Sequence, residues 1–138
     1  MQQAPKFHLA QVGSEQSCSL DAFKNKIVML TFWTTWCPDS KRDLFAKHRL
    51  FQSLNSKEVV LLMINVTGRE RKVDLKSFLE EHQFRFPVLM DEGTKVYDAY
   101  HCMGVPTTVL LNRNHQIVAS YNDKSTFIEI MKGLSTLL

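Results

Sequence analysis

The sequence IVMLTFWTTWCPDS, residues 27 to 40, decides how this chain folds. Its first seven residues are continuously apolar or β-branched, which is typical of a central strand covered on both faces. Pro38 suits the first position of a helix, because the N–H at that position has no intrahelical partner. The stretch therefore predicts a strand that ends near Trp33, a short turn, and a helix that begins beside Cys37.

Other segments have the apolar runs that are typical of strands, or the apolar spacing of three and four residues that is typical of helices. Four of them read as strands: VVLLMINV (59–66), PVLM (87–90), TTVLLN (107–112) and IVASY (117–121). Apolar spacings of three and four predict helices over 38–54, 73–82 and 94–100. Thr126 and Glu129 form a capping box before a last helix. Ahead of the first central strand, KFHLAQV and SCSL are expected to pair as a hairpin.

This order of elements predicts an α/β fold with a mixed sheet. The alternating strands and helices of the first half should be parallel with right-handed crossovers, and the last two strands should be antiparallel across a tight turn. Helices are then expected on both faces of the sheet. No linker, repeat or low-complexity tract interrupts the 138 residues, so we expect one domain over 1–138.

Composition and charge exclude several classes of protein. The net charge of +3 is too small to indicate nucleic-acid binding, and we expect RERK (69–72) to be a solvated loop or helix start. The three cysteines lack the spacing of a metal knuckle or a disulfide scaffold, and the five histidines are scattered. We therefore expect no metal and no cofactor. No apolar run is long enough to span a membrane, and MQQAPKFHLA lacks a signal-peptide pattern, so either the protein is cytoplasmic or a leader has been removed.

Cys37 is the candidate nucleophile. It lies where a strand ends and a helix begins, at the edge of the sheet where α/β folds place their sites. The helix N-terminus favours thiolate over thiol, although Asp39 opposes this effect if its carboxylate points toward the sulfur. Trp33 and Trp36 are expected to wall the sulfur and to offer a partner an apolar surface. The alternative is a bystander cysteine at a strand end.

A second motif, GVPTT (104–108), strengthens this interpretation. A proline directly after a turn often marks a tight or cis bond. A cis Pro106 would expose the backbone of Val105, to which an extended substrate could pair as an added strand. Taken alone, Pro106 could equally be an ordinary proline at the start of a strand.

The motifs together resemble the thioredoxin superfamily, and in particular its TlpA/ResA-like thiol–disulfide oxidoreductases. The likeness covers nearly the whole chain, from SLDAFKNKIVMLTFWTTWCP through FRFPVLMDEGTKVYDAY to GVPTTVLLNRNHQIV. It implies a three-layer α/β/α fold with an N-terminal hairpin. It also implies that Cys37 attacks, that Pro106 is a cis-proline facing it, and that Trp36, Pro38, Val105 and Thr107 line the substrate surface.

The resemblance also has implications for two further positions. Thr31 stands where thioredoxin has a buried aspartate that assists proton transfer, so that aid is absent here. Glu70 could stand in for an acidic residue that some members hold near the site, or it could be an ordinary acid of a surface loop.

The sequence departs from the family pattern at Ser40. Members with two cysteines use the second one to resolve the mixed disulfide, and a serine cannot do so. Its hydroxyl could instead donate a hydrogen bond to the Cys37 thiolate. Three interpretations stay open: a serine introduced to trap partners, a natural monothiol enzyme resolved from outside, and a redox-silent binding module.

The expected partners follow from this chemistry. They are a client protein with a disulfide or cysteine pair and an external thiol or reductase, acting on a monomer, on the extracytoplasmic side of a bacterial membrane or in the cytoplasm. A peroxiredoxin-like role is disfavoured, because Leu30 stands where such enzymes place a proline, although Thr34 fits their pattern. Cys18 and Cys102 are interpreted as packing residues or free thiols.

Overall fold

The computed structural model describes residues 2–138 and is built around a five-stranded sheet. In spatial order the strands are β5 (Val88–Met90), β4 (Val59–Asn65), β3 (Ile27–Trp33), β6 (Thr107–Leu111) and β7 (Ile117–Tyr121). The pairs β3–β4 and β4–β5 are parallel, whereas β6 runs antiparallel to both of its neighbours. The predicted mixed sheet, with its parallel first half and antiparallel end, is confirmed.

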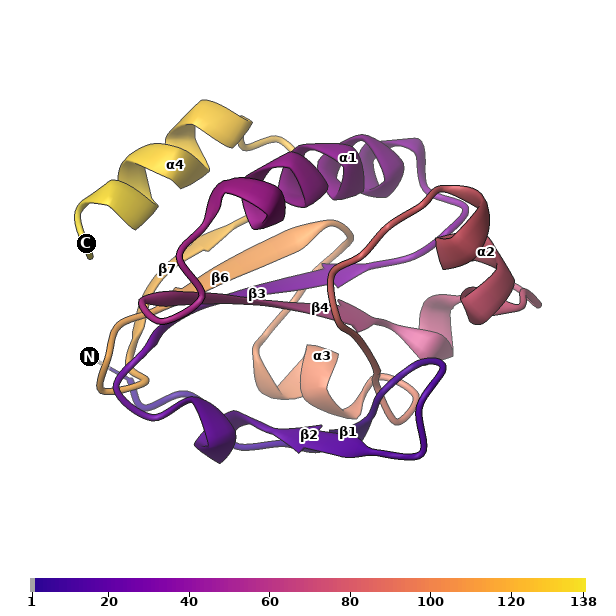
Figure 1. Ribbon diagram of the computed structural model, residues 1–138, viewed down its shortest axis with the longest axis horizontal. Helices are drawn as coiled ribbons and strands as arrows, with labels where there is room; N and C mark the ends of the chain where they lie inside the picture. Colours follow the sequence, from indigo (N-terminus) through magenta and orange to yellow (C-terminus); the bar gives the residue numbers. More distant parts are fainter. Residues whose placement is uncertain (1) are drawn as a thin grey trace.

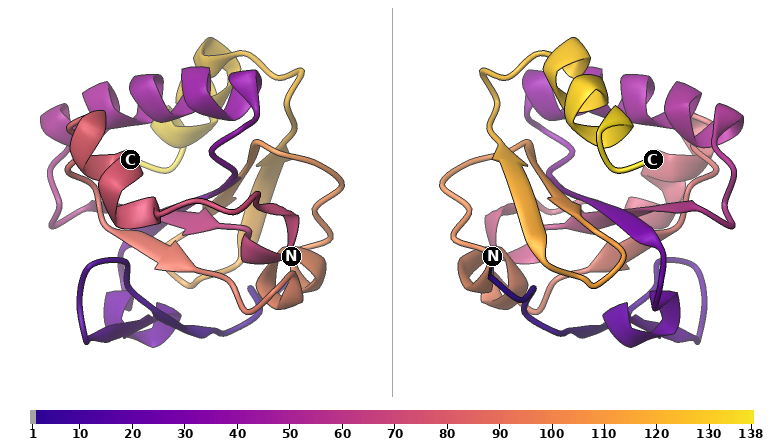
Figure 2. Two further views of the ribbon diagram at one scale, coloured as in Figure 1. Left: turned by 90° about the vertical axis from the view of Figure 1, so that its right-hand side faces the viewer. Right: turned by 90° about the vertical axis from the view of Figure 1, so that its left-hand side faces the viewer.

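Helices cover both faces of the sheet. They are α1 (Pro38–Ser53), α2 (Leu75–Glu81), α3 (Lys95–Ala99) and α4 (Phe127–Ser135), with short 3-10 turns η1 (Leu20–Phe23) and η2 (Thr67–Arg69). Helices α1 and α4 lie over one face, and α3 lies over the other together with the antiparallel hairpin β1 (His8–Ala10) and β2 (Ser17–Ser19) (Figure 1). The two side views show the same layers (Figure 2). The thioredoxin-like three-layer fold with an N-terminal hairpin is therefore confirmed.

The central strand β3 supplies both cores because its side chains alternate between the faces. Val28, Leu30 and Phe32 pack into the cluster that includes the hairpin and α3. Ile27 and Met29 point the other way, into the cluster that includes α4. All seven residues of β3 are buried, so a continuously apolar strand is what this position requires. Each such side chain contributes about 1.5–3 kcal/mol on burial.

Helix α2 is shorter than its apolar pattern predicted. It begins at Leu75, because the side chain of Asp74 accepts a hydrogen bond from the backbone N–H of Ser77 and caps the helix there. Val73, which the pattern included, lies before the cap and is 40% exposed. The predicted capping box of Thr126 and Glu129 is confirmed at the start of α4. In the described residues, no helix has the length and apolar character needed to cross a membrane.

Candidate active site

Cys37 is the N-cap residue of α1, directly after the turn that follows β3. The helix starts beyond the carboxyl end of the central strand (Figure 1), and the Cys37 side chain makes no capping hydrogen bond to the helix. The thiol is half-buried, and its Sγ lies 3.7 Å from the carbonyl oxygen of Val105, to which it donates. The Val105–Pro106 peptide bond is cis. The two motifs, 68 residues apart in the chain, therefore meet at one sulfur atom.

Ser40 lies in the first turn of α1 and is completely buried. Its hydroxyl oxygen accepts a hydrogen bond from the backbone N–H of Thr34 at 3.4 Å. Within residues 2–138 no hydrogen bond joins Ser40 to Cys37, and the bond that the thiol makes goes to Val105 instead. The expected support of the thiolate by the Ser40 hydroxyl is therefore not part of this structure. Through this hydrogen bond, Ser40 instead joins α1 to the turn before the cysteine.

Trp33 does not wall the sulfur, so that prediction is wrong. Its side chain has no exposed surface and stacks on Phe78 of α2, with ring centroids 5.8 Å apart. The cause is the alternation of β3, which turns residue 33 into the core between the sheet and the helices. Trp36 follows the end of the strand and is 42% exposed, as the prediction required.

The side chain of Thr107 does not lie on the substrate surface, so that prediction is also wrong. Its side chain is buried, and its hydroxyl donates a 2.7 Å hydrogen bond to the carbonyl oxygen of Gly104. Thr107 thus closes the loop before β6 from inside and presents no side chain to a partner. Of the other residues predicted for this surface, Pro38 is exposed, Val105 is half-buried and Pro106 is buried.

Glu70 is more than an acid on a surface loop. Its carboxylate accepts hydrogen bonds from the backbone N–H and the hydroxyl of Thr35, at 2.9 and 2.6 Å, and from the side-chain amide of Asn65, at 2.7 Å. It also accepts from the backbone N–H of Arg71 at 3.0 Å. One half-buried carboxylate therefore ties the turn before Cys37 to the end of β4.

Replacing Glu70 by alanine should loosen this turn. Because the N–H of Thr35 and the amide of Asn65 would lose their acceptor, we expect a loss of about 1–3 kcal/mol in the free energy of unfolding. Glu70→Gln keeps one acceptor oxygen and should lose less. Denaturant unfolding gives the energies, and hydrogen exchange at Thr35 reports the turn itself. Unchanged exchange protection of Thr35 in Glu70→Ala would contradict this assignment.

A buried lysine that was not predicted from the sequence lies beneath the site. Lys47 of α1 has no exposed side-chain surface, and its Nζ donates to the hydroxyls of Thr31 (2.7 Å) and Thr108 (2.9 Å) and to the carboxylate of Asp43 (3.0 Å). Burial lowers the pKa of Lys47, and the charge and hydrogen bond of Asp43 act in the opposite direction. Thr31 and Thr108 face each other across β3 and β6, so two polar residues in apolar strands were the signal for a polar partner.

Neither of the other thiols shares the setting of Cys37. Cys102 packs against the core below the hairpin, and burial raises its pKa to about 12. Burial also raises the pKa of Cys18, which lies in β2. A thiol with a raised pKa is a poor nucleophile at neutral pH. Both residues therefore fit the packing role that the sequence indicated.

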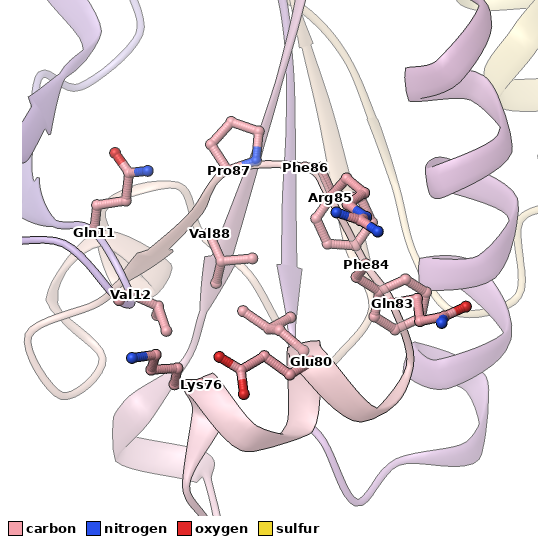
Figure 3. A pocket seen from close by; sticks show the side chains of 12 residues that line it. Gln11, Val12, Lys76, Glu80, Gln83, Phe84, Arg85, Phe86, Pro87 and Val88 are labelled. Carbon is pink, nitrogen blue, oxygen red and sulfur yellow. The ribbon is translucent and has the colours of Figure 1, made fainter.

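A surface pocket of about 550 Å³ opens elsewhere, between α2, the chain leading into β5 and the loop of the N-terminal hairpin (Figure 3). Its lining mixes charged and apolar groups: Gln11, Val12, Gly13, Lys76, Leu79, Glu80, Gln83, Phe84, Arg85, Phe86, Pro87 and Val88. It contains no cysteine and none of the residues around Cys37. Cys37 therefore lies outside this pocket.

These features define a class of protein, the thioredoxin-like α/β proteins whose cysteine lies at the N-terminus of the helix after the central strand and faces a cis-proline. The chain belongs to the AhpC/TSA family, whose model matches residues 1–120.

Named relatives add to this placement. The chain is 29% identical over 137 residues to the thiol-disulfide oxidoreductase ResA of Halalkalibacterium halodurans, covering 95% of this chain and 76% of that protein. It is 32% identical over 137 residues to ResA of Oceanobacillus iheyensis, covering 97% of this chain and 65% of that protein. The fold matches the exposed lipoprotein thioredoxin Etrx1 of Streptococcus pneumoniae with a TM-score of 0.84 at 22% identity, over 96% and 100% of the two chains. The names of the two sequence relatives support the prediction that this chain is an oxidoreductase.

Proposed function

We propose that this chain carries out thiol–disulfide exchange on protein cysteines through Cys37 alone. The observation that carries the proposal is the meeting of Cys37 Sγ with the carbonyl of Val105, next to the cis bond to Pro106. An extended client chain could pair with the Val105 backbone and bring its own sulfur to the thiolate. The sulfur lies at the N-cap of α1, the helix end that leaves backbone N–H groups without an intrahelical partner.

The reaction is a displacement at sulfur. The Cys37 thiolate attacks one sulfur of a client disulfide, a new S–S bond forms, and the second client sulfur leaves as a thiolate. In family members with two cysteines, the second one attacks this mixed disulfide and releases the client. Ser40 occupies that place here and cannot form a disulfide. The exchange therefore stops at the mixed disulfide until an external thiol or a reductase arrives.

Trapping of Cys37 tests the proposal. When the reduced protein is mixed with a disulfide-bonded peptide, we expect one covalent adduct per chain, located at Cys37, that persists until a thiol is added. The reason is that burial raises the pKa of Cys18 and of Cys102, which makes these two thiols poor nucleophiles at neutral pH, whereas Cys37 lies between the exposed residues Trp36 and Pro38. Intact mass and peptide mapping give the stoichiometry and the site.

The matched controls are Cys37→Ala and Cys102→Ala. The first should abolish the adduct and the second should leave it unchanged. If Cys37 forms no adduct, the exchange function fails and the chain is better explained as a redox-silent binding module.

We place this activity on the extracytoplasmic side of a bacterial membrane. Support comes from the resemblance to the TlpA/ResA-like branch and from the name of the structural neighbour, which is an exposed lipoprotein. Fractionation of cells that produce the protein checks this placement.

A further inference from the structure

Three cations beside the reactive thiol lack a carboxylate partner. Arg69, Arg71 and Lys72 are all exposed. The described part of the chain, residues 2–138, holds four ion pairs, and none of them includes these three side chains. Glu70 lies among them in sequence, but its carboxylate points inward to the turn before the thiol. The segment 69–72 therefore presents a positive surface to the solvent.

This positive surface contacts Trp36, the residue before Cys37. The guanidinium of Arg71 lies over the ring of Trp36, 4.7 Å from its centroid. The ring nitrogen of Trp36 donates a 2.9 Å hydrogen bond to the carbonyl oxygen of Arg69. Trp36 directly precedes Cys37, so the positive surface begins one residue from the nucleophile. The aromatic contact limits the freedom of Arg71 and holds its charge beside Trp36, the residue before Cys37.

Apolar side chains and one ion pair lie around the rest of the site. Met103, two residues before Val105, is 97% exposed, and Trp36 is 42% exposed. On the helix side, the carboxylate of Asp39 is paired with Arg42, which weakens its repulsion of an acidic client. A chain that crosses the sulfur thus meets apolar side chains on both sides and a positive charge on the side of Trp36.

We propose that Arg71 selects client segments that carry an aspartate or glutamate close in sequence to the reacting cysteine. The inference rests on the proposed exchange function and names the chemistry of its client. Complementary charge raises the rate at which the two sulfurs meet and disfavours basic clients. The exchange step itself is unchanged: one S–S bond forms, one breaks, and no external electron is needed.

The test compares three synthetic peptides. Each has one cysteine activated as a disulfide with the same aromatic thiol, flanked by Asp and Glu, by Ser, or by Lys. At low ionic strength we expect the acidic peptide to react with Cys37 about tenfold faster than the basic one, and the ratio should shrink in high salt. The release of the aromatic thiol gives the second-order rate constants.

Two variants with the same change in net charge complete the test. Arg71→Glu should reverse the order of the acidic and basic peptides. Lys57→Glu should preserve the order, because Lys57 is exposed next to the start of β4, at the opposite end of that strand from the site. Equal rates for all three peptides, or the same response to both variants, overturn the inference and leave the exchange function standing. No reaction with any peptide overturns the exchange function itself.

Discussion

Replacing Ser40 by cysteine should convert this protein from a reagent that reacts once into a catalyst. The wild-type chain is expected to stop at a mixed disulfide, because Cys37 is the only accessible thiol at the site. Residue 40 lies in the first turn of α1, and the Ser40 side chain is fully buried under the turn that carries Cys37. A thiol in that place could attack the mixed disulfide from below and release the client.

Turnover is the measurement. With a chemical reductant and a disulfide-bonded protein substrate, we expect Ser40→Cys to raise the rate of reduction about a hundredfold or more over wild type, the range in which intramolecular attack outruns attack by a dilute external thiol. Cys37→Ser combined with Ser40→Cys is the control and should not turn over, because the buried thiol alone cannot reach a client. If Ser40→Cys forms the adduct and still fails to release it, then α1 does not hold residue 40 in a resolving position.

The three central strands could be predicted from the sequence because they are buried on both faces. A strand covered on both sides must be apolar throughout, so β3 was predicted with the observed bounds and β4 and β6 to within one residue. The edge strand β7 is only partly buried, and its predicted bounds also match the observed ones. Helix α2 was harder to predict. Its start depends on the side chain of Asp74 as a cap, which no apolar spacing reveals.

The site was predictable where the chemistry is local. Cys37 and Trp36 follow from one turn between a strand and a helix, whereas Trp33 was wrongly placed because two tryptophans three residues apart face different sides. Contacts between distant segments were harder to foresee. The bonds from Glu70 to Thr35 and from Lys47 to Thr31 and Thr108 join elements that only the folded sheet brings together.

Removing the side chain of Lys47 should be the most destabilising change near the site. Lys47→Ala leaves a cavity and removes the ion-pair partner of Asp43. It also removes the hydrogen-bond donor to the buried hydroxyls of Thr31 and Thr108. We therefore expect a loss of about 3 kcal/mol or more in the free energy of unfolding, measured by denaturant titration. Lys47→Met keeps most of the volume and should lose much less, because methionine packs where the lysine stem lies.

The pH dependence then separates the charge of Lys47 from its packing. Burial lowers its folded pKa below the unfolded value of about 10.4, so between those two values the unfolded chain binds more protons than the folded one. The stability of wild type relative to Lys47→Met should therefore rise as the pH increases through this window. Lys57→Met, a change at an exposed lysine, should show no such trend. If the curves of wild type and Lys47→Met stay parallel up to about pH 10, Lys47 titrates as it does in the unfolded chain and its burial carries no electrostatic cost. A rising difference would show that keeping Lys47 charged between Thr31 and Thr108 costs stability.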